Sequence, residues 1–181
     1  MGPHSPYLYD EASLCRIKQL CNDYHCLMHI HVQETADELE SSLQGDHSNS
    51  HCHKSQEKSS PIANLARLGI LDHTCCAHCV HVLESDIDLL AKHHASVVHC
   101  PHSNLKLASG IAPIQHMLDQ GVNVALGTDG ASSNNNLNML QEMRTAALIG
   151  KVASGDPKSI SAMTVRLKDE YKSVGFRNCY N

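Results

Sequence analysis

Four polar side chains stand where apolar, strand-like runs of the sequence end. Imidazole nitrogens and carboxylate oxygens are suitable ligands for zinc or iron, and a metal with an open coordination position generates hydroxide near neutral pH. Such groups at the carboxyl ends of parallel strands would meet at one edge of a sheet. The pattern therefore predicts a hydrolytic metal site, whose candidate residues are His31, His78, His99 and Asp129.

Each of these histidines, taken alone, has a simpler interpretation as a core residue with a hydrogen-bonded ring, because a single histidine says little about metal binding. Four polar strand ends in register favour the metal site. Glu34 follows His31 by three residues, on the loop that leaves the predicted strand. Its carboxylate would reach a substrate beside the metal, and a solvated loop carboxylate is the equally supported alternative.

Three nearby groups imitate metal motifs. His29 and His31 alternate on one strand and share a side, but no third ligand is near, so we interpret His29 as a packing residue. The cysteines and histidines of residues 75–81 resemble a zinc knuckle without its paired Cys-x-x-Cys halves, which makes a zinc-binding module a minor alternative. A polar stretch collects further ligand types that would bind metal only adventitiously, namely His47, His51, Cys52 and His53.

The elements that would position these residues alternate along the chain. Strands are predicted near residues 27–32, 74–80, 96–100 and 122–127, and helices after the N-caps Asp10, Ser60 and Ser85, near 110–120 and near 137–148. This alternation predicts an α/β fold with a parallel sheet and right-handed crossovers. Periodicity alone leaves open whether the sheet forms a barrel or an open doubly wound arrangement. The polar residues from about 41 to 60 predict an exposed loop.

Composition narrows the class of protein. The formal net charge is -5 with scattered Lys and Arg, which argues against a nucleic-acid surface. The sequence shows neither a long apolar stretch nor a basic leader, so we expect no membrane span and no export. Nine cysteines then predict reduced thiols in a cytoplasmic protein. The 181 residues are too few for a typical (β/α)8 barrel of about 250 residues, so the fold is either smaller or incomplete.

Several motifs resemble a known family. The segments 31–35, 77–80, 99–110 and 127–134 read His-Val-Gln-Glu-Thr, Ala-His-Cys-Val, His-Cys-Pro-His-Ser-Asn-Leu-Lys-Leu-Ala-Ser-Gly and Gly-Thr-Asp-Gly-Ala-Ser-Ser-Asn. They are similar, in order, to the amidohydrolase superfamily and specifically to 5-methylthioadenosine/S-adenosylhomocysteine deaminases. The resemblance implies part of a metal-dependent hydrolase (β/α)8 TIM barrel, roughly strands five to eight with their helices. It implies a domain over residues 1–165 with a polar insertion at 40–60, and a divergent tail at 166–181.

The resemblance also implies roles for individual residues. His31 and Asp129 would hold one zinc or iron(II) ion, and Asp129 would also take the proton of the attacking water. Glu34 would shuttle a proton to the purine ring, His78 would contact the substrate or the hydroxide, and His4 would touch the bound nucleoside.

One departure from the family pattern is important. The family also needs a His-x-His pair on its first strand, and nothing before Gly2 supplies it. We therefore expect a parent enzyme that deaminates 5-methylthioadenosine, S-adenosylhomocysteine or a related adenosine, with this chain as an inactive fragment. The alternatives are an amidohydrolase of an amino- or chloro-heterocycle of the triazine or guanine type, and a non-catalytic remnant. The expected partner is a small adenine-type nucleoside, and homo-oligomerisation is left open.

Overall fold

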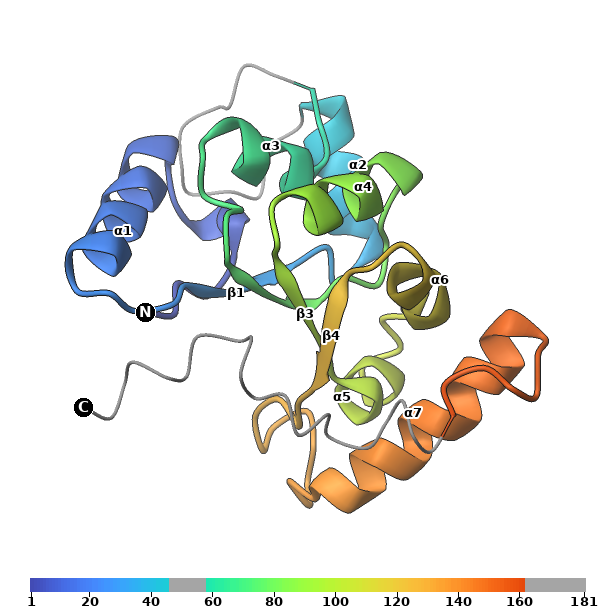
Figure 1. Cartoon of the computed structure of the whole chain (residues 1–181). Helices are drawn as coiled ribbons and strands as arrows, with labels where there is room; N and C mark the ends of the chain where they lie inside the picture. The colour runs from blue at the N-terminus through green and yellow to red at the C-terminus, as the bar shows by residue number, and fades with distance from the viewer. Residues whose placement is uncertain (46–57, 162–181) are drawn as a thin grey trace.

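A parallel four-stranded sheet organises the molecule, which is a computed structural model that describes residues 1–45 and 58–161 (Figure 1). The strands lie in the order β1-β2-β3-β4, and each neighbouring pair is parallel. All four predicted strands are confirmed, so their carboxyl ends share one edge of the sheet. Their bounds are His29–Val32 (β1), Cys75–His78 (β2), Ser96–His99 (β3) and Asn123–Leu126 (β4).

Helices connect the strands, in the expected alternation. Asp10 and Ser60 cap the first turns of α1 and α3, since their side chains accept hydrogen bonds from the backbone N–H groups of Ser13 and Ala63. Both caps were predicted. The helices of the described residues are the 3-10 helix η1 (Pro6–Leu8), α1 (Glu11–Asp23), α2 (Ala36–Gln44), α3 (Pro61–Arg67), α4 (Glu84–Lys92), α5 (Pro101–Lys106), α6 (Ile114–Asp119) and α7 (Met139–Ser154).

Some predicted boundaries were wrong. Helix α4 begins at Glu84, and Ser85 lies inside it, because the Asp86 carboxylate accepts a 2.9 Å hydrogen bond from the Leu83 N–H and caps the helix two residues earlier. Helix α2 extends to Gln44, so the predicted loop at 41–60 begins later than expected. Residues 46–57 of that loop and the predicted tail at 166–181 lie outside the described residues.

Three further differences concern helix length and number. Helix α6 starts at residue 114 instead of 110, and α7 covers 139–154 instead of 137–148. The sequence pattern did not predict α5, a six-residue helix that begins with Pro101 directly after β3. Proline suits this first helical position because its missing N–H would have no partner there.

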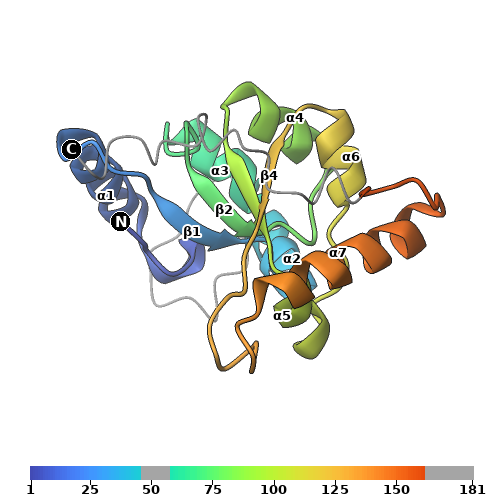
Figure 2. The same ribbon diagram turned by 60° about the horizontal axis from the view of Figure 1, so that its bottom comes forward.

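The core lies on one face of the sheet. Ile30, Cys76 and Val97 occupy the same level of three adjacent strands, and each is completely buried. Helices α3 and α4 cover them with side chains such as Leu65 and Leu90. Figure 2 shows the sheet extending from β1 beside α1 to β4 beside α6 and α7.

The opposite face of the sheet is less covered. The side chains between the core positions include His31 and Val98, which are half-buried, and Ala125, which is exposed. The outer edge of β1 is partly paired, because the N–H groups of His29 and His31 donate to the carbonyls of Met1 and His4, both at 2.9 Å. In the described residues β4 pairs with β3 alone. None of the helices in these ranges combines the length and apolarity that a membrane crossing requires.

Candidate metal centre

Three potential ligands converge at the carboxyl edge of the sheet. His31, His78 and Asp129 each offer one ligand atom, and these atoms lie within 4.8 Å of one another. His31 Nε2 is 3.8 Å from Asp129 Oδ1, and His78 Nε2 is 3.9 Å from Asp129 Oδ2. Within residues 1–45 and 58–161 this is the one group of at least three such residues. The predicted meeting of these three strand ends is therefore confirmed.

The ring of His31 is held by the segment that precedes α1. Its Nδ1 lies 2.7 Å from the carbonyl oxygen of His4, which can only accept a hydrogen bond, so Nδ1 carries the proton. The Nε2 lone pair is then free to face Asp129. Histidines that bind metals commonly donate their other ring N–H to a carbonyl in this way. The ring of His4 lies 4.7 Å from that of His31, which places His4 beside the centre.

The second histidine, His78, is almost completely buried, with 1% of its side chain exposed. Its backbone adopts a left-handed conformation, with φ at 73°. Its Nδ1 lies 2.8 Å from Asn104 Oδ1, and its ring centroid is 5.2 Å from that of His31. The buried Nε2 has no hydrogen-bond partner in the described part of the chain. A buried polar atom without a partner is costly, and a cation at the centre would satisfy it.

The carboxylate of Asp129 is fixed by two serines. Its Oδ2 accepts hydrogen bonds of 2.7 Å from Ser103 Oγ and from Ser133 Oγ. Burial acts to raise the pKa of Asp129, but these two bonds and one from the Gly130 backbone outweigh burial and lower that pKa to about 2. Asp129 is therefore ionised near neutral pH, as a metal ligand must be. Neither serine was predicted from the sequence, although each lies in a motif already noted.

Glu34 lies next to this group. Its Oε2 is 3.8 Å from His78 Nε2, and a quarter of its side chain is exposed. The backbone N–H of Glu34 donates to Glu38 Oε2 at 3.0 Å, which ties the loop after β1 to the first turn of α2. Burial raises the pKa of Glu38 to about 7. Glu34 thus combines proximity to the centre with access to solvent, which suits a group that exchanges protons.

Other candidates do not join the centre. His99 ends β3 at the same edge, but it is 2% exposed, belongs to no metal-ligating group of the described residues, and burial lowers its pKa to about 4. His29 is exposed, so its interpretation as a packing residue was wrong.

Of the cysteine-histidine cluster at 75–81, His78 alone joins a metal-ligating group in the described residues. Cys79 Sγ donates to the Cys76 carbonyl, and the His81 ring contacts the Ser109 carbonyl. None of its three cysteines, Cys75, Cys76 and Cys79, belongs to a metal-ligating group in the described ranges. The predicted adventitious ligands at 47–53 lie outside the described residues.

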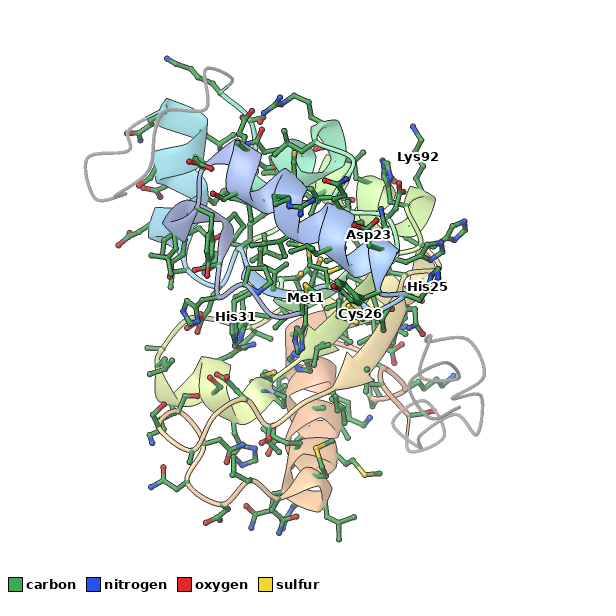
Figure 3. All side chains as sticks on the ribbon, turned by 90° about the vertical axis from the view of Figure 1, so that its left-hand side faces the viewer. Met1, Asp23, His25, Cys26, His31 and Lys92 are labelled. Atoms are coloured by element: carbon green, nitrogen blue, oxygen red, sulfur yellow. The ribbon has the colours of Figure 1, made fainter. Side chains whose placement is uncertain are left out.

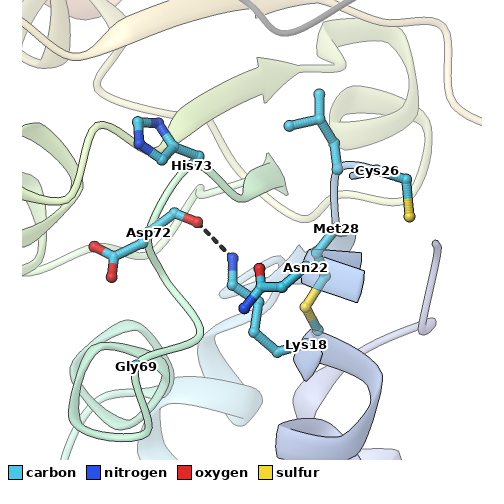
Figure 4. A pocket seen from close by; sticks show the side chains of 8 residues that line it. Lys18, Asn22, Cys26, Met28, Gly69, Asp72 and His73 are labelled. Carbon is cyan, nitrogen blue, oxygen red and sulfur yellow. Dashed lines mark hydrogen bonds between the residues drawn. The ribbon is translucent and has the colours of Figure 1, made fainter. Parts of the chain in front are cut away.

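A surface pocket lies at the opposite end of the strands from the centre. It has a volume of about 240 Å³, and Lys18, Met28, Asp72 and His73 contribute to its wall (Figure 4). The Lys18 amine donates to the Asp72 carbonyl at 2.5 Å. Met28 and His73 precede β1 and β2, so the pocket is at the amino edge. Figure 3 shows the same separation, since Cys26, which lines the pocket and precedes β1, lies apart from His31.

The donor set therefore fits a divalent metal ion: two imidazole nitrogens, one of them buried without a partner, and one ionised carboxylate. Comparison with known proteins agrees. The model of the amidohydrolase family matches residues 1–165. The chain belongs to the amidohydrolase family. The match includes every residue of the centre.

Two curated relatives illustrate the similarity. The 5-methylthioadenosine/S-adenosylhomocysteine deaminase of Teredinibacter turnerae is 46% identical, over 98% of this chain and 38% of the relative. The 5'-deoxyadenosine deaminase of Methanothrix thermoacetophila is 44% identical, over 86% of this chain and 35% of the relative. The chain thus spans little more than a third of the amidohydrolases that it matches. Its predicted resemblance to this group of deaminases is confirmed.

Solved amidohydrolase structures share the fold. An adenosine deaminase from Xanthomonas campestris with bound zinc matches with a TM-score of 0.81 and 38% identity, over 91% of this chain and 35% of that chain. The atrazine chlorohydrolase of Arthrobacter aurescens, complexed with zinc, matches with a TM-score of 0.79 and 26% identity, over 91% and 34%. The parallel sheet with its helices is therefore part of a (β/α)8 barrel, as predicted, and the zinc in both structures supports a divalent metal here.

Proposed function

We propose that this chain forms part of the active site of a zinc-dependent deaminase that releases ammonia from an adenine-type nucleoside. The observation that carries the proposal is the convergence of His31, His78 and Asp129 with Glu34 beside them. The names of the relatives support the reaction, since they act on 5-methylthioadenosine, S-adenosylhomocysteine and 5'-deoxyadenosine. The free thiols of the seven described cysteines support a cytoplasmic location.

His31 and Asp129 would hold the metal. Their Nδ1 and Oδ2 atoms are hydrogen-bonded to the protein, which leaves Nε2 of His31 and Oδ1 of Asp129 facing the centre. A zinc ion lowers the pKa of a bound water and so supplies a nucleophile near neutral pH. Iron(II) would suit the same nitrogen and oxygen donors. Asp129 Oδ1 lies toward His31 and would accept a proton from the attacking water.

Glu34 would deliver a proton to the purine ring, so that the carbon bearing the amino group accepts the nucleophile. His78 Nε2 lies 3.8 Å from Glu34 Oε2 and would contact the substrate between them. His4, beside His31, would contact the bound nucleoside. Transfer to the amino group of the proton that Asp129 took from the water would then let the C–N bond break, so that ammonia leaves and the water oxygen stays on the ring carbon.

A second candidate is an amidohydrolase of a related heterocycle. It is favoured by the structural similarity to a guanine deaminase from C. acetobutylicum, with a TM-score of 0.71 and 25% identity, and to the atrazine chlorohydrolase. The metal machinery is shared by these reactions, whereas substrate choice depends on the pocket. The third alternative is a non-catalytic remnant, which a metal-binding assay would distinguish.

The test is a chimaera in which this chain replaces the matching segment of the Teredinibacter turnerae deaminase. Ammonia release is measured with 5-methylthioadenosine, S-adenosylhomocysteine, 5'-deoxyadenosine, adenosine and guanine, and chloride release is measured with a chlorotriazine. Guanine and the chlorotriazine represent the second candidate function. Turnover of an adenine nucleoside above the other two supports the proposal. A folded, zinc-loaded chimaera that is inactive on all four nucleosides, beside an active parent, would overturn it.

A further inference from the structure

We propose that Asn104 is a positioning residue that holds His78 in the tautomer whose Nε2 lone pair faces the metal centre. The expected effect on catalysis rests on the proposed function. The tautomer of His78 does not, because it can be measured on the chain itself. Asn104 lies on α5, outside the residues that converge at the centre, and the sequence gives no direct indication of such a role.

The geometry fixes the proton on His78. His78 and Asn104 are both 1% exposed, and their Nδ1 and Oδ1 atoms are 2.8 Å apart. An amide oxygen only accepts hydrogen bonds, so Nδ1 must donate. A neutral imidazole carries one proton, which leaves Nε2 with a bare lone pair. Water cannot readily replace Asn104 at this buried position, so the amide oxygen alone decides the tautomer.

The surroundings of Nε2 show what this tautomer is for. Nε2 lies 3.8 Å from Glu34 Oε2 and 3.9 Å from Asp129 Oδ2, which is too far for a hydrogen bond. A bare lone pair so close to two acidic side chains is unfavourable unless a cation or a proton donor lies between them. The hydrogen bond from His78 to Asn104 therefore commits His78 to receive a cation or a proton at the centre.

The backbone of Asn104 is held on both sides. Its N–H donates to the Cys100 carbonyl at 3.0 Å, and its carbonyl accepts from the Ser109 N–H at 2.8 Å. Its side-chain Nδ2 is buried without a hydrogen-bond partner in the described residues, and the reverse orientation of the amide would place that donor against Nδ1 and leave the proton of His78 on Nε2. Its neighbour Ser103 donates to Asp129 Oδ2 at 2.7 Å. One short helix thus orients two of the converging side chains. An aspartate at position 104 would also accept from Nδ1.

The test measures the proton directly. Long-range 1H–15N correlation spectra of the 181-residue chain with 15N-labelled histidine distinguish the two tautomers, and His78→Gln identifies the His78 signals. We expect a single Nδ1–H form. Asn104→Leu should lose that preference, and Asn104→Asp should keep the Nδ1 proton. The matched control is Asn64→Leu on α3, where Asn64 accepts from Arg67, and it should leave the His78 signals unchanged.

Two results would overturn the proposal. One is an Nε2–H form of His78 in the unmodified chain, a measurement that holds even if Asn104→Leu fails to fold. The other is a folded Asn104→Leu chain, judged by circular dichroism, whose His78 signals are unchanged.

In the chimaera, Asn104→Leu should lower kcat by about ten- to a hundredfold with little change in KM, the usual cost of losing a partner behind a metal site. Asn104→Asp should restore part of that loss, which a merely structural role would not predict. If the tautomer is as expected and the chimaera is inactive, the proposed function fails and the role of Asn104 in setting the tautomer stands.

Discussion

The two serines behind Asp129 give a quantitative test of the centre. Replacing Ser103 by alanine removes one of two 2.7 Å hydrogen bonds to Asp129 Oδ2. A hydrogen bond to a charged group contributes about 1.5–3 kcal/mol. Because 21% of the Asp129 side chain is exposed, water replaces the lost donor in part, so we take the lower end of that range. This corresponds to about tenfold weaker zinc binding, since 1.4 kcal/mol is a factor of ten.

The effect should be the same at pH 5 and at pH 7. The pKa of Asp129 is about 2 because the serine hydrogen bonds outweigh burial, which acts in the opposite direction. Losing one bond of about 1.5 kcal/mol raises this pKa by about one unit. Asp129 therefore stays ionised at both pH values in both proteins, and protons do not compete with zinc for it. We expect the ratio of the two zinc affinities to be equal at pH 5 and pH 7.

The assay is isothermal titration of zinc into the 181-residue chain at the two pH values. The double variant Ser103→Ala with Ser133→Ala should lose more than either single variant, though less than the sum, because both serines act on one oxygen. Ser132→Ala, an exposed serine in the same loop, is the control and should bind zinc normally. Equal zinc affinity of Ser103→Ala and the unmodified chain at both pH values would refute the reasoning.

The remaining predictions concern catalysis, assembly and stability. In the chimaera, Glu34→Gln should retain zinc by elemental analysis and lose about a hundredfold to ten-thousandfold in rate, whereas Asp129→Asn should lose zinc and activity together; near-normal ammonia release by Glu34→Gln would exclude its role. The 181-residue chain alone should bind zinc weakly, release no ammonia and self-associate in light scattering through the edge of β4 that no described strand pairs with; a monomer with turnover would contradict this. Gly127→Ala should destabilise the chain by about 1–3 kcal/mol in urea unfolding, because the added carbon would lie 2.7 Å from Val98 Cγ1. The control Gly130→Ala, whose added carbon meets only Ser132 Oγ at 3.9 Å, should cost less.

The strands and their shared edge could be predicted because the apolar runs are short, regular and separated by capped helices. The alternation of side chains along a strand also explains which polar residues at the strand ends lie on the less covered face of the sheet. His31 lies between the buried Ile30 and Val32, so its ring points away from the core. His99 lies two residues after the buried Val97 and continues the core face. The sequence therefore contained the reason that His99 stays out of the centre.

His78 shows where alternation fails. It lies two residues after the buried Cys76 and would by the same rule belong to the core, yet its Nε2 reaches the centre. The left-handed backbone at His78 and at the following residue Cys79 bends the chain out of the strand pattern. Non-glycine residues rarely adopt this conformation, and no residue type in the sequence signals it here.

The hydrogen bonds that Asn104 and Ser103 make to the centre could not be predicted from the sequence either. Asn104 and Ser103 each contact a partner 26 residues away, and both depend on α5, which is too short to produce a periodic signal. The residues that face the metal centre could therefore be predicted from residue type and strand position. The residues that fix the protonation and orientation of those side chains could not. Helix α5 supplies both partners, since Asn104 contacts His78 and Ser103 contacts Asp129. A change that shifts this helix should therefore disturb both contacts at once. Asn104→Leu and Ser103→Ala are accordingly expected to be non-additive in zinc affinity, which a double-mutant cycle on the 181-residue chain would measure.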